Sequence, residues 1–106
     1  MKHRIAWSVL AKTDLLNILL YVQKDGVGTG LGLVKLIRSE TSKLKYFPFL
    51  GRMVLELTGD KSDQFRELIV SRYRVIYSVG ANTVQVQTIV DQSQDLETQF
   101  LKRLKP

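Results

Sequence analysis

The chain has 106 residues, and its 16 Lys and Arg outweigh its 10 Asp and Glu, so the net charge is +6 and the isoelectric point about 9.8. With no cysteine, it has neither a disulfide framework nor a thiolate metal site nor a cysteine nucleophile. A content of 44% apolar and 25% charged residues is typical of one folded domain, expected over 1–106, and the basic excess favours nucleic acid, a ribosome or an acidic protein as partner.

Near the N-terminus, apolar residues are soon interrupted by Lys12 and Asp14, unlike a secretory signal. The longest apolar-rich stretch, 15–22, contains Asn17 and is too short to span a bilayer. The sequence therefore predicts a cytoplasmic protein that has no membrane partner.

The first elements along the chain are a short strand and a helix. Residues 4–8 predict a strand with Ile5 and Trp7 on one face, and Ser8 is a suitable N-cap for the helix that follows. We expect that helix over 9–24, ending at Asp25-Gly26. Its apolar residues follow helical spacing: Ala11, Leu15, Ile18, Leu19 and Val22.

The glycine-rich run 26–32 is interpreted as a connector between helices. A helix precedes it where a dinucleotide fingerprint needs a strand, and it lacks the lysine and Ser/Thr of a P-loop. Since Gly30 and Gly32 would each cost a helix about 1 kcal/mol, we expect the second helix only over 31–46, ended by Phe47-Pro48. Together the two helices predict an antiparallel hairpin.

After Gly51 the apolar period changes to two, which is typical of strands. Strands are predicted over 54–57, 65–70, 73–79 and 84–90, with a polar turn at 58–63, a hairpin loop at 80–83 and a short helix over 96–104. On the third of these strands Tyr73, Val75, Tyr77 and Val79 would share one buried face. The order predicts an α+β fold: an N-terminal strand, a helical hairpin, then a three- to four-stranded, mainly antiparallel sheet with a short C-terminal helix.

At this point the sequence resembles the ParE/RelE superfamily of toxins, and is more similar to ParE. The resemblance covers nearly the whole chain. Its motifs are Trp7-Ser8 with Ala11, Asp14-Leu15, Ile18 and Tyr21; Pro48 with Leu50-Gly51-Arg52; Phe65-Arg66-Glu67-Leu68; Arg72-Tyr73-Arg74-Val75-Ile76-Tyr77; and, more loosely, 86–95.

The resemblance implies the toxin of a type II toxin–antitoxin, or plasmid stabilisation, system. ParE-like toxins inhibit DNA gyrase without hydrolysis, whereas RelE-like toxins cut mRNA on the ribosome with basic residues and usually a tyrosine. In both cases it implies a cognate antitoxin, and a toxin–antitoxin complex that binds operator DNA through the antitoxin.

A RelE-like site would use Arg66 and Arg74, which match the strand positions of that family's basic residues. The segment 91–95 offers acids and amides where the family often carries histidine and arginine, and Phe100 cannot exchange a proton. The only histidine, His3, has no obvious partner, and arginine is a poor general base. We therefore expect no catalytic residue unless the chain is RelE-like.

The prediction is a ParE-like gyrase inhibitor that grips its target through Arg66, Arg72, Arg74 and Arg52, with no cofactor and no metal. Structural alternatives stay open: these arginines could cover sheet edges or pair with Glu67 and Asp63, and Arg52 could tie a loop down. The alternative functions are a ribosome-dependent mRNA endonuclease and a relative that has lost its toxicity.

Overall fold

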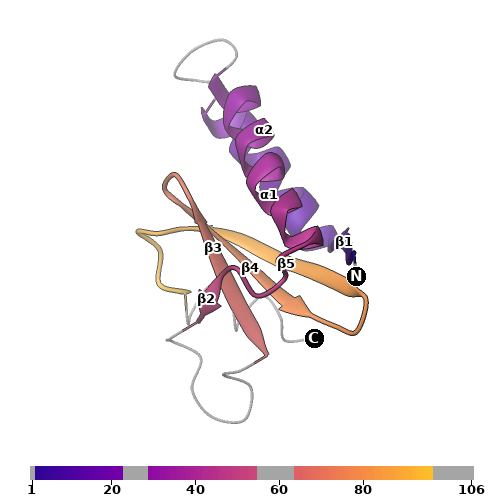
Figure 1. The fold of residues 1–106 in the computed structure, drawn as a ribbon. Helices are drawn as coiled ribbons and strands as arrows, with labels where there is room; N and C mark the ends of the chain where they lie inside the picture. Colours follow the sequence, from indigo (N-terminus) through magenta and orange to yellow (C-terminus); the bar gives the residue numbers. More distant parts are fainter. Residues whose placement is uncertain (1, 23–28, 55–63, 97–106) are drawn as a thin grey trace.

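A pair of helices lies across one face of a five-stranded sheet (Figure 1). The computed structural model describes residues 2–22, 29–54 and 64–96. The elements are β1 (Arg4–Trp7), α1 (Val9–Val22), α2 (Thr29–Ser42), the 3₁₀ turn η2 (Lys43–Lys45), β2 (Arg52–Met53), β3 (Phe65–Val70), β4 (Tyr73–Val79) and β5 (Thr83–Asp91). The predicted α+β class is confirmed.

The strands lie in the order β1-β5-β4-β3-β2. All neighbours are antiparallel except β1 and β5, which run parallel, with Arg4 opposite Thr83 and Trp7 opposite Val86. The predicted N-terminal strand, β1, thus joins the predicted, mainly antiparallel sheet, which has five strands in all. A parallel neighbour needs a crossover connection, and the helical hairpin lies within it.

The second helix begins earlier than predicted. α2 starts at Thr29 and takes in both glycines that we expected to delay it. Gly30 is buried where α2 crosses α1, and a Cβ there would collide with the backbone carbonyl of Leu19. The close helix–helix packing therefore offsets the poor helix propensity of this glycine.

The main core lies between the helices and the sheet. Ala11, Leu15, Ile18 and Ile37 pack there against Tyr73, Val75, Val86 and Ile89, while Tyr77 and Val79 join a neighbouring cluster with Leu44. The shared buried face predicted for β4 is confirmed. A smaller cluster with Ile76, Val54, Val90 and Leu96 shows that β4 is covered on its other face as well.

Hydrogen bonds at Ser8 and Asp14 join the start of α1 to a β-bulge in β5. Ile76 pairs with Thr88 but Tyr77 pairs with Val86, so one residue of β5 bulges out of the ladder. The Ser8 hydroxyl donates to the Gln87 carbonyl at 2.7 Å and accepts from the Ala11 N–H at 3.0 Å, which confirms the predicted cap. Asp14 Oδ2 accepts from Thr88 Oγ1 at 2.7 Å and from Ile89 N–H at 2.9 Å.

Of the predicted strand over 54–57 only Val54 is described, and it follows β2, which covers Arg52–Met53, without belonging to a strand. Residues 55–57, the predicted turn at 58–63 and nearly all of the predicted helix over 96–104 lie outside the described residues. Within the described ranges, no helix has the length and apolar character needed to cross a membrane.

Candidate functional site

Two of the predicted arginines converge on one buried carboxylate. Glu67 in β3 has a side chain only 1% exposed; its Oε1 accepts from Arg52 Nε at 2.7 Å and its Oε2 from Arg74 Nε at 2.8 Å, with a second bond from Arg74 Nη2. The Arg74 side chain is only 9% exposed. Arg74 therefore ties β4 to β3, as the structural alternative proposed, and lies too deep to meet a large partner.

Arg72 lies at the turn between β3 and β4 and pairs with an acid of its own. Its Nε donates to Asp91 Oδ2 at 2.6 Å, and this bond raises the pKa of Arg72. Partial burial raises the pKa of Asp91, but hydrogen bonds from Ser93 and the pairing with Arg72 outweigh it, so the pKa lies below its usual value. Asp91, one of the two acids of the 91–95 segment, is thus neutralised locally.

Gly51 anchors the loop before β2. Its N–H donates to the Tyr77 hydroxyl at 2.8 Å, and its carbonyl accepts from Arg66 Nη1 at 2.8 Å. A Cβ at Gly51 would collide with the Glu67 carbonyl and lie 2.7 Å from the Tyr77 hydroxyl. The Leu-Gly-Arg motif therefore needs glycine because the loop lies directly on β3 and β4.

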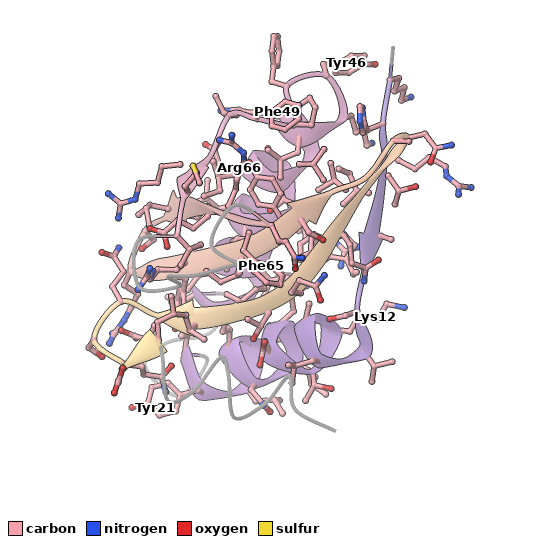
Figure 2. The ribbon with its side chains drawn as sticks, turned by 90° about the horizontal axis from the view of Figure 1, so that it is seen from below. Lys12, Tyr21, Tyr46, Phe49, Phe65 and Arg66 are labelled. Atoms are coloured by element: carbon pink, nitrogen blue, oxygen red, sulfur yellow. The ribbon has the colours of Figure 1, made fainter. Side chains whose placement is uncertain are left out.

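Arg66 differs from the other three arginines. Its guanidinium lies 5.0 Å from the centre of the Phe49 ring, and within 2–22, 29–54 and 64–96 it forms no ion pair with a carboxylate. Figure 2 shows Arg66, Phe49 and Tyr46 gathered at one end of the molecule, with Lys12 on another side. Among the described residues, the Arg66 guanidinium is thus held by the Phe49 ring and by its hydrogen bond to the Gly51 carbonyl.

Several large apolar side chains are exposed in the segment that leads to β2 and on β2 itself. Tyr46, Phe47 and Phe49 are each more than 60% exposed. We call the aromatic–arginine surface the set Tyr46, Phe47, Phe49, Leu50, Met53 and Arg66. Contiguous exposed apolar groups mark interaction sites, and aromatic residues, Met and Arg are the types enriched in protein–protein interfaces.

The sequence analysis missed the aromatic members of this surface because it used Phe47-Pro48 only as a helix stop. The run 46–50, Tyr-Phe-Pro-Phe-Leu, carried a signal, since it is apolar yet belongs to no predicted helix or strand. The four predicted arginines are not brought together. Arg66 lies on the aromatic–arginine surface, Arg52 and Arg74 meet at Glu67, and Arg72 lies at the β3–β4 turn.

Proton-transfer groups near Arg66 are scarce in the described part of the chain. Tyr77 is fully buried, its hydroxyl accepts the Gly51 N–H, and burial raises its pKa, partly offset by that bond and by Arg66. His3 precedes β1, and β1 is separated from β3 by three strand spacings, or about 14 Å. Neither of these two side chains is placed to exchange a proton with a substrate bound at Arg66. A third candidate, Tyr46, is exposed, and its ring lies 6.0 Å from Lys2 Nζ.

Comparison with known proteins gives a family match over most of the chain. Residues 5–96 match the family described as the ParE toxin of the type II toxin–antitoxin system parDE. No curated protein sequence matches significantly.

Several solved structures share the fold. The chromosomal ParDE toxin–antitoxin system from P. aeruginosa matches with a TM-score of 0.69 and 19% identity, over 85% of this chain and 96% of that one. The toxin RelE of E. coli, a double mutant in the free state, gives 0.62 and 11%, over 99% and 100%. The RelBE2 toxin–antitoxin complex from Mycobacterium tuberculosis gives 0.59 and 13%, over 86% and 99%.

Proposed function

Because the chain belongs to the ParE toxin family of type II toxin–antitoxin systems, we propose that it acts by binding DNA gyrase and that a cognate antitoxin neutralises it. In this proposal the aromatic–arginine surface is the contact with gyrase. Inhibition results from binding, and no bond is made or broken by the toxin.

One observation carries the choice of binding over cleavage. Arg66 lies on Phe49, and Tyr77, which is opposite Arg66 in the pairing of β3 with β4, is buried and hydrogen-bonded to Gly51. Cleavage of RNA through its 2′-hydroxyl needs a group that takes a proton and another that returns one. A cation on an aromatic ring supplies charge and contact area, which are what a protein interface uses.

The predicted set of target contacts becomes smaller in this proposal. Arg66 is its central charge. Arg52, whose side chain is 64% exposed, pairs with Glu67 and therefore lies on the opposite face of the sheet from Arg66, outside the proposed contact. Arg72 is exposed but already paired with Asp91, and Arg74 stabilises the sheet. The antitoxin partner is supported by the similar structures, two of which are toxin–antitoxin systems.

The experiment that tests the proposal is a supercoiling assay with purified gyrase and the purified chain. We expect loss of supercoiling and accumulation of a stabilised gyrase–DNA cleavage complex. Phe49→Ala and Arg66→Gln should each weaken inhibition about tenfold or more, as expected for central interface residues. Lys12→Gln removes the same charge from another side of the molecule and should leave inhibition unchanged (Figure 2).

Two results would contradict the proposal. Normal supercoiling at a large excess of toxin would exclude gyrase as the target. Equal inhibition by the wild type and by Arg66→Gln and Phe49→Ala would exclude the aromatic–arginine surface as the contact. Inhibition of growth when the gene is induced would exclude the alternative of a relative that has lost its toxicity.

A further inference from the structure

A cleft lies between α1 and the neighbouring ends of β4 and β5. It has a volume of about 500 Å³, within the range of about 300–1,000 Å³ that is typical of sites for small molecules. Its lining includes Asp14, Ile18 and Tyr21 from α1, Tyr73 from β4, and Ile89 and Asp91 from β5. Figure 2 shows Tyr21 at the opposite end of the molecule from Tyr46 and Phe49, so the cleft is separate from the aromatic–arginine surface.

The inner part of the cleft is apolar and firmly packed. Ile18, Tyr73 and Ile89 line it and are buried members of the main core. Tyr21, in the last turn of α1, also lines the cleft but is mostly exposed, so its ring lies at the entrance. The cleft therefore suits a ligand with an apolar body and a second group near the entrance.

The lining is acidic although the chain is basic. Among the described residues that form it, Asp14 and Asp91 supply two carboxylates and Arg72 one guanidinium, so the lining has a charge of −1 in a chain whose net charge is +6. Asp14 is buried and is fixed at the β5 bulge by its bonds from Thr88 and Ile89. The cleft therefore favours a cation over an anion.

The turn after β5 holds Asp91 at the side of the cleft. Its Oδ1 accepts from the Ser93 N–H at 2.9 Å, and its own N–H donates to Gln94 Oε1 at 3.1 Å. The Arg72 guanidinium, which pairs with Asp91, is itself 62% exposed. Because an ion pair with an exposed partner is weak, another cation can take the place of Arg72.

The chemistry of the lining decides which ligand fits. Ammonium and guanidinium groups only donate hydrogen bonds, and carboxylates such as Asp91 only accept them. The exposed face of the Tyr21 ring adds a cation–π contact at the entrance. A short alkyl chain attached to the cation would lie against Ile18 and Ile89.

We infer that this cleft binds a small organic cation, an ammonium or guanidinium group on a short apolar chain. The charged group lies near Asp91 and Tyr21 and displaces Arg72, and the chain packs against Ile18 and Ile89. The inference does not depend on gyrase or on an antitoxin.

The test is an NMR titration of the whole chain with butylguanidinium. We expect saturable shifts of the backbone amides of Ile18, Tyr21 and Ile89, with a dissociation constant of about 1–10 mM, as is reasonable for so small a ligand. Butylurea has the same shape without the charge and should bind at least about fivefold more weakly. Butyrate, which carries the opposite charge, should not bind.

Variants test the position of the charged group. Arg72→Gln removes the competing cation and should tighten binding about two- to fivefold. Tyr21→Leu removes the aromatic face and should weaken binding by a similar factor. Lys12→Gln is the matched control, because it lowers the net charge of the chain as Arg72→Gln does but does not line the cleft, so it should leave binding unchanged. Circular dichroism checks that each variant is folded.

Three outcomes would overturn the inference. The first is no saturable binding of butylguanidinium at tens of millimolar, or equal binding of butylurea. The second is a set of shifts around Phe49 and Arg66 while Ile18 and Ile89 are unchanged. The third is binding that Arg72→Gln weakens, or that Lys12→Gln changes as much as Arg72→Gln does. A failed supercoiling assay affects none of these readouts.

Discussion

Replacing Glu67 should destabilise the fold more than any substitution of an exposed arginine. Its carboxylate is 1% exposed and accepts from both Arg52 and Arg74, and the Arg74 side chain is 9% exposed. Glu67→Ala would leave the Arg74 guanidinium buried without this carboxylate, a change that costs about 3–5 kcal/mol. Because small domains are stable by only about 5–15 kcal/mol, this is a large fraction of the total.

Urea denaturation followed by circular dichroism measures this cost. Arg52→Ala is the matched control: the Arg52 side chain is 64% exposed, so its ion pair should be worth about 0–1 kcal/mol. The pair Glu67→Leu with Arg74→Met removes both charges and should be more stable than Glu67→Ala alone. The reasoning would be refuted by a loss below about 1 kcal/mol for Glu67→Ala, or by a double variant no more stable than the single one.

Three further predictions concern the scaffold. Gly30→Ala should lower the free energy of unfolding by about 1–3 kcal/mol, because its Cβ meets the Leu19 carbonyl. Gly32→Ala, with open space around it, should raise the free energy of unfolding by up to about 1 kcal/mol. Equal effects of the two substitutions in urea denaturation would argue against the contact between the helices. Asp14→Ala should cost about 1–3 kcal/mol for each bond lost at the β5 bulge, measured the same way, and a neutral result would show that water replaces the carboxylate. Since the folded state lowers the pKa of Asp91, the contribution of this carboxylate to stability is present above about pH 4 and is lost as the pH falls further. The urea midpoint of Asp91→Asn should therefore fall less than that of the wild type between about pH 6 and about pH 3. An equal fall in both proteins would contradict this prediction.

Local signals in the sequence were enough for most of the elements. Ser8 begins α1 as a cap, and the apolar residues of α1 face the sheet, because both properties depend on neighbours within one or two turns of helix. The alternation from Tyr73 to Val79 likewise predicts the buried face of β4.

Features that depend on distant contacts could not be predicted in this way. The pairing of β1 with β5 joins residues almost eighty positions apart, so no local pattern shows it. Gly30 belongs inside α2 because Leu19 lies opposite, and helix propensity alone argues against it.

The candidate site was predicted only in part, because it too depends on contacts between residues that are distant in the sequence. The basic charge and the family motifs indicated the four arginines, but the role of each depends on a partner that the sequence does not place. These partners are Glu67 for Arg52 and Arg74, Asp91 for Arg72, and Phe49 for Arg66. The exposed run at 46–50 became informative only once the fold showed nothing among the described residues to bury it.

The most direct test of binding without cleavage compares two targets with one preparation of the chain. Purified gyrase with relaxed plasmid and translating ribosomes with a defined mRNA each receive the same series of toxin concentrations, and agarose gels and primer extension give the readouts. We predict that supercoiling stops while the mRNA stays intact at every codon. Cut mRNA at concentrations that leave gyrase active, with cutting lost in Arg66→Gln, would show that this surface cleaves and would contradict the account.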